Sequence, residues 1–215
     1  MSVKLTGPMV MPQDTPAKRV VVLLHGYGSD GNDLIALAPY LRDLLPDAIF
    51  VAPNAPMSCD INPAGFQWFP LDLDRDFSRL NGAQMARPVI NEFLADLWAE
   101  TGLSAANTLL CGFSQGAMMA LDVGLRQSEP LLGIVAFSGG LIQPDTIGEA
   151  LASEPPVCLI HGEADDVVPV EMSRASATAL QALGLDVSLY VSPGQGHTIP
   201  PDGLEAARTF IARIA

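Results

Sequence analysis

The hydrophobic residues of this chain gather in short unbroken runs, and longer segments with helical spacing separate these runs. The runs cover residues 18–25, 48–52, 109–111, 131–137, 157–160 and 187–191. A run without polar alternation is typical of a strand that lies inside a sheet and is covered by helices on both faces. Each run therefore predicts a buried strand.

Between these runs, apolar residues recur every three or four positions, as they do in an amphipathic helix. This spacing predicts helices over residues 32–45, 83–100, 170–183 and 204–214, and a further apolar helix directly after residue 116. Pro88 is expected near the start of its helix or at a kink. Strands that alternate with helices predict an α/β fold with a mostly parallel, doubly wound sheet and right-handed crossovers.

The length and composition of the chain predict a single domain with one hydrophobic core. The chain has 215 residues, of which 49% are hydrophobic, so we expect residues 1–215 to form a single α/β domain. Residues 53–77 follow neither pattern, and the first half of this segment is rich in proline. Such a length is unusual for a plain connection, which predicts a functional surface loop.

The segment around Ser114 carries the clearest chemical signal. A short strand breaks at Gly112-Phe113-Ser114-Gln115-Gly116, and an apolar helix follows at once. This is G-x-S-x-G in a strand–turn–helix setting, the nucleophile elbow, where glycines let the backbone turn tightly and expose the serine. The pattern alone arises by chance in roughly one chain in ten of this length, so the alternative is an incidental serine in a glycine-rich turn.

A serine hydroxyl is a poor nucleophile and needs a base, and the chain has three histidines from which to choose. Hydrolases with this elbow place the serine, the acid and the histidine in that order along the chain. His197 fits this order, because it lies in the loop after the last predicted strand. His25 and His161 are more simply explained as loop histidines that bond to nearby backbone.

The acid is expected in the loop after the strand at 157–160, where three carboxylates compete. Asp165 has the spacing of an H-G-x-x-D-x-x-V-P pattern and is the predicted acid. Asp166 is the second choice and Glu163 the third. Whichever two are not the acid are expected to solvate the turn or cap the following helix.

Acyl transfer also needs two backbone N–H groups aimed at the oxygen on which negative charge develops. One is expected from Gln115, which follows the predicted nucleophile, and the other from Tyr27, in the loop after the first long strand. The backbone supplies both donors, so the shape of the turns matters more than these side chains.

The loop that contains Tyr27 also matches a different motif. Gly26-x-Gly28-x-x-Gly31 is the dinucleotide-binding fingerprint, with a strand before it and a helix after it. The acidic residue that should end the next strand is missing, because residues 51–54 read Val-Ala-Pro-Asn. Nicotinamide or flavin binding is therefore kept only as an alternative, and we expect no cofactor.

The stretch Asp72-x-Asp74-x-Asp76 begins like a calcium-binding loop. Phe77 stands where that loop needs glycine, and Ala83 stands where it needs glutamate. The stretch is therefore interpreted as a solvated loop, and no metal site is predicted.

Charge and cysteine content narrow the expected partners. The net charge of −13 argues against nucleic acid as a partner and weakly against anionic substrates and membrane surfaces. No apolar run reaches the length of a membrane span, so no stable membrane insertion is expected. The three cysteines are an odd number, two of them lie in apolar runs, and no signal peptide is visible, which together predict a cytoplasmic protein.

Taken together, these motifs closely resemble the phospholipase/carboxylesterase family of α/β-hydrolases, which includes the acyl-protein thioesterases and small bacterial carboxylesterases. The motifs that carry the resemblance are His25-Gly26-Tyr27-Gly28, Gln67-Trp68-Phe69, Gly112-Phe113-Ser114-Gln115-Gly116, His161-Gly162-x-x-Asp165-x-x-Val168-Pro169 and Gly196-His197. The resemblance covers nearly the whole chain and departs at Ala117, where many members have another glycine.

The resemblance implies hydrolysis of carboxylic esters or thioesters, with a small-molecule or lipid ester as substrate and no cofactor. It assigns Ser114 as nucleophile, Asp165 as orienting acid, His197 as base and acid, and Tyr27 and Gln115 as the oxyanion hole. Small members of the family often pair, so a homodimer is compatible with the resemblance. The alternative function is a non-catalytic binding protein that kept the α/β-hydrolase fold.

The wall of the site is expected from the loop at 53–77. Only about twenty residues separate the strands that end at 137 and begin at 157, too few for a cap domain. The site should therefore be open. Trp68 resembles the family's aromatic residue beside the acyl group, and Phe69 is expected beside it, together with Phe66 and Leu71, although aromatic residues here would equally cover the core.

Overall fold

The structure is a computed structural model that describes residues 4–13 and 15–215. Within these residues, the centre of the molecule is a seven-stranded sheet in the order β1-β3-β2-β6-β7-β8-β9. The strands are β1 (Met9–Val10), β2 (Arg19–Leu24), β3 (Ala48–Val51), β6 (Thr108–Phe113), β7 (Gly133–Phe137), β8 (Val157–Gly162) and β9 (Val187–Ser192). Only β1 runs antiparallel to its neighbour, so the predicted mostly parallel sheet is confirmed.

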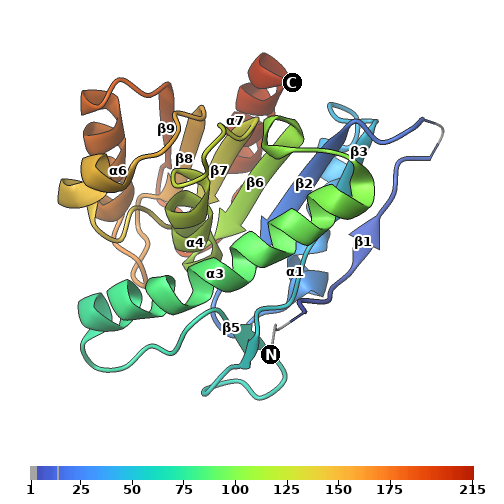
Figure 1. The fold of residues 1–215 in the computed structure, drawn as a ribbon. Helices are drawn as coiled ribbons and strands as arrows, with labels where there is room; N and C mark the ends of the chain where they lie inside the picture. The colour runs from blue at the N-terminus through green and yellow to red at the C-terminus, as the bar shows by residue number, and fades with distance from the viewer. Residues whose placement is uncertain (1–3, 14) are drawn as a thin grey trace.

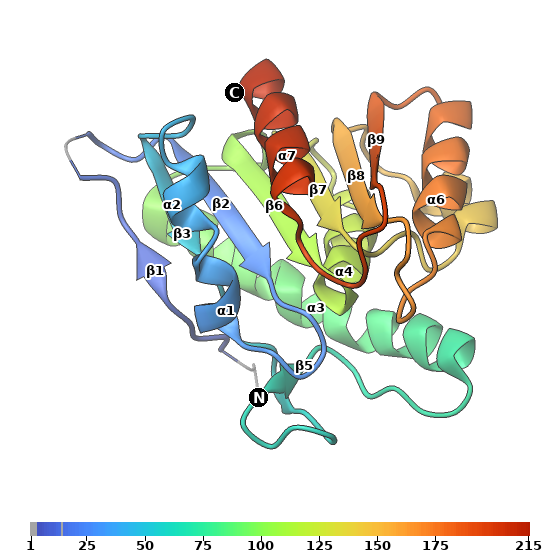
Figure 2. The same cartoon turned by 180° about the vertical axis from the view of Figure 1, so that it is seen from behind.

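Helices cover both faces of this sheet, as expected for a doubly wound α/β fold. One face carries α3 (Arg75–Thr101), α4 (Gln115–Gly124) and α6 (Glu171–Ala182), which lie in front of the sheet in Figure 1. The opposite face, seen in Figure 2, carries α1 (Gly31–Ile35), α2 (Ala38–Leu41) and α7 (Pro201–Ile214). The short helix α5 (Ile147–Ala150) and two 3₁₀ turns, η1 (Ala105–Asn107) and η2 (Pro144–Thr146), complete the fold.

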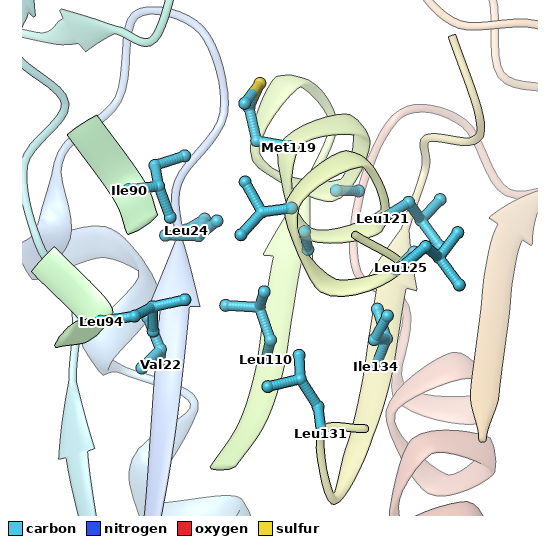
Figure 3. Packing of buried hydrophobic residues seen from close by; sticks show 14 of the residues in the cluster. Val22, Leu24, Ile90, Leu94, Leu110, Met119, Leu121, Leu125, Leu131 and Ile134 are labelled. Atoms are coloured by element: carbon cyan, nitrogen blue, oxygen red, sulfur yellow. The ribbon is translucent and has the colours of Figure 1, made fainter. Parts of the chain in front are cut away.

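The sheet has an apolar cluster on each face, which explains why its strands lack polar alternation. The larger cluster joins β2, β6 and β7 to α3 and α4, and Figure 3 shows Ile90 and Leu94 of α3 packed against Val22 and Leu24 of β2. The other cluster holds the strands against α1, α2 and α7. Strands that are buried on both sides are fully apolar for this reason.

Helix α3 begins earlier than the hydrophobic spacing predicts, at Arg75 rather than near residue 83. The reason is a cap: Asp74 Oδ1 accepts a hydrogen bond from the Phe77 N–H at 3.1 Å. Asp72 also accepts a hydrogen bond, from Ser78 Oγ in the first turn of α3. The stretch from Asp72 to Asp76, interpreted from sequence as a solvated loop, therefore includes the start of a helix. Pro88 lies well inside the 27-residue helix, rather than near its start.

Two further details differ from the sequence expectations. The helix predicted over residues 32–45 is split into α1 and α2, which end at Ile35 and Leu41. The loop at 53–77 contains a two-stranded hairpin, β4 (Met57–Ser58) and β5 (Phe66–Gln67), and ends where α3 begins. Strands of two residues are too short to leave a periodic signal, which is why β1, β4 and β5 were missed.

The expected absence of a cap domain is confirmed for the segment between β7 and β8, which holds only η2 and α5. No helix in the described part of the chain has the length and apolar character needed to cross a membrane. Cys59, Cys111 and Cys158 are free and buried, as the sequence predicted for a chain without a disulfide framework.

The strand order also locates the site. The chain passes from β2 to β3 on one side and later places β6 on the other side of β2. In open parallel sheets, ligands bind outside the carboxyl ends of the strands at such a switch point. The loop after β2 carries Tyr27, and the turn after β6 carries Ser114, so both expected site segments meet there.

Candidate active site

Ser114 occupies the turn between β6 and α4 in a strained conformation. Its φ of 54° and ψ of −115° are unusual for a residue with a side chain. A Cβ on Gly116 would overlap the carbonyl oxygens of Leu24 and His25, and a Cβ on Gly112 would overlap the backbone of Gly116. Both glycines are therefore required for α4 to start against the end of β2, and this packing holds the turn at Ser114.

A chain of hydrogen bonds joins the three residues predicted as the catalytic set. Ser114 Oγ lies 3.0 Å from His197 Nε2, and His197 Nδ1 lies 2.7 Å from Asp165 Oδ2. The residues come from the ends of β6, β8 and β9, which are far apart in sequence. Neutral His197 with its proton on Nδ1 donates to the carboxylate and accepts the serine hydroxyl, which is the arrangement that a general base requires.

The environment of Asp165 favours its ionised form. Burial opposes ionisation, but hydrogen bonds from His197 and from the backbone N–H groups of Val168 and Val167 outweigh it, so the pKa of Asp165 lies below its usual value. The two competing acids lie elsewhere: Asp166 is exposed, and Glu163 accepts a hydrogen bond from the Gly194 N–H at 3.1 Å.

His161 also contacts Asp165, which the sequence did not indicate. It is fully buried at the end of β8, and its Nε2 lies 2.8 Å from Val168 O and 3.2 Å from Asp165 Oδ2. Its Nδ1 lies 2.7 Å from Ser173 Oγ on α6. Burial lowers the pKa of His161, although the Val168 carbonyl and Asp165 oppose this shift. His161 thus holds the acid loop against α6 in addition to bonding to backbone.

His25 and Trp68 fix the loop after β2. His25 Nε2 accepts a hydrogen bond from the Ala55 N–H at 2.9 Å, while Nδ1 contacts Gly26 O at 2.8 Å. Trp68 Nε1 donates to His25 O at 2.9 Å, and the two rings pack with their centroids 5.5 Å apart. Trp68 is 1% exposed. These contacts hold the backbone directly before Tyr27.

The two residues expected to supply backbone donors for an oxyanion hole, Tyr27 and Gln115, line the same cavity as Ser114. Gln115 is the first residue of α4, so its N–H has no intrahelical acceptor. Position 26 is next to the elbow, because a Cβ on Gly26 would lie 3.4 Å from Ser114 Cβ, and Tyr27 follows it. No hydrogen bond from the Tyr27 N–H or the Gln115 N–H to another described residue is present.

The side chain of Gln115 has a structural task that its position in the motif does not indicate. Its Oε1 accepts from the Trp68 N–H at 2.9 Å, and its Nε2 donates to Phe69 O at 2.8 Å. Through these bonds, the residue after the serine holds the wall segment, residues 66–71, against the elbow.

The serine opens into a cavity of about 330 Å³, which lies within the range of small-molecule sites. Phe69 and Leu71 of the wall segment line the cavity, whereas Phe66 and Trp68 are not among its lining residues. The residues that line it are Tyr27, Ile61, Phe69, Leu71, Arg75, Arg79, Ser114, Gln115, Met118, Val167, Val168 and His197. Two arginines thus line the same cavity as the serine, although nothing in the sequence motifs marks them.

The alternative cofactor and metal motifs have other partners here. The Gly31 N–H, which opens α1, donates to Asn54 Oδ1 at 2.8 Å, and the Asp33 N–H donates to Asp30 Oδ1 at 3.0 Å. A pyrophosphate would have to replace these side chains and approach two carboxylates, which disfavours the dinucleotide interpretation. No cluster of metal-ligating side chains is present among the described residues.

A doubly wound sheet with this hydrogen-bond chain at its switch point defines the class of the protein, the α/β-hydrolases. The sequence profile of the phospholipase/carboxylesterase family matches residues 5–215, and the chain belongs to this family. It is a serine hydrolase that acts on carboxylic esters.

Individual relatives agree with this placement. Acyl-protein thioesterase 1 of Gibberella zeae is 27% identical over 99% of this chain and 97% of its own length. Esterase YpfH of Escherichia coli is 29% identical over 93% of this chain and 84% of its own length. Among solved structures, esterase PE8 superposes with a TM-score of 0.97 at 57% identity, covering 99% of this chain and 100% of that one.

A more distant solved structure has the same fold. A phospholipase/carboxylesterase from Dyadobacter fermentans superposes with a TM-score of 0.76 at 28% identity and covers 98% of both chains.

Proposed function

We propose that Ser114, His197 and Asp165 form the catalytic triad of this esterase. The observation that carries the proposal is the pair of hydrogen bonds from His197, at 3.0 Å to Ser114 Oγ and at 2.7 Å to Asp165 Oδ2. His197 takes the serine proton as Oγ attacks the ester carbonyl carbon. Asp165 holds the imidazole ring with its Nδ1 proton toward the carboxylate and stabilises the imidazolium that forms.

The attack produces a tetrahedral intermediate whose oxygen is negative. In this proposal, the N–H groups of Tyr27 and Gln115 donate to that oxygen, and removal of one such donor costs about 10²- to 10³-fold in kcat. His197 then protonates the leaving alcohol or thiol, and the C–O or C–S bond breaks to leave an acyl group on Ser114. Water attacks the acyl-enzyme along the same path, with His197 again as the base.

The cavity supports a substrate of modest size with an apolar acyl group. Its volume of about 330 Å³ and its apolar lining, which includes Phe69, Leu71 and Met118, suit a short or medium acyl chain. Simple esters, acyl thioesters and lysophospholipids all contain the same acyl carbonyl. We propose simple esters as the first substrates to test, and a chain-length series of 4-nitrophenyl esters and acyl thioesters as the means of ranking the others.

The test combines turnover with covalent labelling. Ser114→Ala should lower kcat by several orders of magnitude with a short 4-nitrophenyl ester and should abolish labelling by a fluorophosphonate probe. Ser104→Ala, at an exposed serine in the turn before η1, is the matched control and should retain both signals. Wild-type turnover in Ser114→Ala would refute the assignment, and an unlabelled wild-type protein would favour a non-catalytic binding role.

A further inference from the structure

The cavity beside Ser114 contains two positive charges in a strongly acidic protein. The chain has 11 lysines and arginines against 24 aspartates and glutamates, yet Arg75 and Arg79 both line this cavity. They lie four residues apart on α3, so their side chains emerge from the same face of the helix, about 6 Å apart at Cβ. Like charges at this spacing destabilise a helix, so the pair is not explained by the stability of α3.

Among the described residues, the two arginines share a single carboxylate partner, and that carboxylate is exposed. No hydrogen bond or ion pair from the Arg75 side chain to any described residue is present. Arg79 has one ionic partner, Asp76, whose oxygen lies 3.4 Å from Nη1 and whose side chain is 97% exposed. An ion pair with a fully solvated carboxylate contributes little. The Arg79 side chain is only 11% exposed and lines the cavity, and its one hydrogen bond to a described residue is the one to Asp76, so the guanidinium has further N–H donors for an anion.

No aspartate or glutamate is among the residues that line the cavity, and three aspartates next to lining residues in sequence or bonded to one have other partners. Asp74 caps α3 through the Phe77 N–H, and Asp72 accepts from Ser78 Oγ. Asp165 is bound by His197 and by two backbone N–H groups. Burial and the nearby positive charge of Arg75 lower the pKa of Arg79, while Asp76 opposes this shift. An anion bound between Arg75 and Arg79 would reduce the electrostatic repulsion between the two guanidinium groups.

We propose that the esterase site recognises substrates that carry a negatively charged group, which Arg79 and Arg75 bind while the ester carbonyl lies at Ser114. The proposal rests on the proposed role of Ser114 and adds a substrate class to it. The apolar residues Leu71, Met118 and Val167 line the same cavity, so the substrate is amphiphilic: an apolar segment connects the ester to a carboxylate or a phosphate. Arginine suits both groups, because its planar guanidinium donates two parallel hydrogen bonds to them.

The experiment compares esters that differ only in the charge. The mono-4-nitrophenyl esters of adipic and suberic acid carry a terminal carboxylate, and 4-nitrophenyl hexanoate and octanoate are their neutral partners of equal length. The readout is the ratio of kcat/KM for the anionic ester to that for the neutral ester, with kcat and KM determined separately. Loss of a charge-assisted hydrogen bond should lower this ratio about 10- to 100-fold in Arg79→Gln, mainly through KM.

Matched variants separate recognition from damage to the fold. Arg75→Gln changes an exposed side chain and should lower the ratio less than Arg79→Gln, and its effect should fade at high salt. Arg79→Lys keeps the positive charge but cannot form the bidentate pair of hydrogen bonds, so its ratio should lie between those of Arg79→Gln and wild type. Arg42→Gln, at the end of α2, removes the same charge outside the cavity and should leave the ratio at its wild-type value.

The source of the anion is tested with a monoacylglycerol and the lysophosphatidate of the same chain. A ratio that depends on the arginines in either series supports the proposal and identifies carboxylate or phosphate as the group recognised. Ratios that are equal in wild type, Arg75→Gln and Arg79→Gln in both series would overturn it. That outcome would leave the esterase function intact, whereas failure of every ester to react would instead contradict the role of Ser114.

Discussion

The buried histidine beside the Tyr27 loop predicts a loss of stability in mild acid. His25 has no exposed surface, and its Nε2 accepts a hydrogen bond from the Ala55 N–H at 2.9 Å. Protonation of Nε2 would break this bond and bury a positive charge. Burial therefore lowers the pKa of His25 below 6.5, although the Gly26 carbonyl and the carboxylates of Asp30 and Asp33 oppose the shift.

The magnitude follows from proton linkage. In the unfolded chain, a histidine with a pKa of about 6.5 gains a proton as the pH falls, whereas folded His25, whose pKa is lowered, binds a proton less readily. The unfolded state then binds more protons, so the free energy of unfolding falls as the pH falls below the unfolded pKa. Between about pH 7.5 and about pH 5.5, one such histidine lowers the free energy of unfolding by at most about 1.4 kcal/mol, the limit for a folded histidine that takes up no proton in this range.

The assay is urea unfolding of wild type and His25→Gln at both pH values. Glutamine can still accept from the Ala55 N–H but does not titrate, so the variant should lose less stability than wild type between the two pH values, by up to about 1.4 kcal/mol. Ile90→Val, a buried change on α3, should lower stability at both pH values and keep the wild-type pH dependence. If the pH dependence of His25→Gln equals that of wild type, the linkage argument is refuted.

Two further predictions test the acid and the wall of the site. Asp165→Asn should lower kcat about a thousandfold or more, because His197 loses the carboxylate that orients it. Asp166 is exposed, and Asp166→Asn should keep a kcat close to that of wild type. A larger loss of kcat in Asp166→Asn than in Asp165→Asn would assign the role to Asp166. Gly82→Ala should lower the free energy of unfolding by about 1–3 kcal/mol, because a Cβ there would overlap the Phe69 ring, and an unchanged urea midpoint would contradict this packing.

The parts of the fold that were predictable from sequence are those whose physical constraint acts on many adjacent residues. Strands buried on both faces must be apolar throughout, and the runs at β2 and β7 show this directly. The elbow was recognisable because a tight turn between β6 and α4 allows only glycine at Gly112 and Gly116. Such constraints leave a continuous or closely spaced pattern in the chain.

The start of α3 was not predictable from the same rules. Its first two turns, from Arg75 to about residue 82, place Phe77 on the surface at 63% exposure, so no apolar face marks them. The helix begins where the Asp74 cap supplies an acceptor, and a single capping residue is a weak signal beside a hydrophobic period. Asp74, one of the three aspartates with the spacing of a calcium-binding loop, therefore acts as the N-cap of α3.

Long-range hydrogen bonds account for what the sequence could not indicate about the site. Gln115 occupies the variable position of the G-x-S-x-G pattern, yet its side chain binds the backbone of Trp68 and Phe69, 47 and 46 residues away. Trp68, which the sequence predicted beside the acyl group, is 1% exposed and donates a hydrogen bond to His25 O. Two side chains thus position the wall segment: Gln115, which the motif assigns to the elbow, and Trp68, which the resemblance assigns to substrate binding.

The charge around the site is a further property that the sequence alone does not predict. A net charge of −13 is a sum over the whole surface, and it argued weakly against anionic substrates. The field at Ser114 depends instead on the few charges that share its cavity, because exposed charges further than about 10 Å away are screened by salt. Arg75 and Arg79 line that cavity, whereas Asp72 and Asp74 accept hydrogen bonds from α3 and Asp76 pairs with Arg79 from an exposed position. The residues that line the site therefore include two positive charges and no carboxylate, although the chain as a whole is acidic.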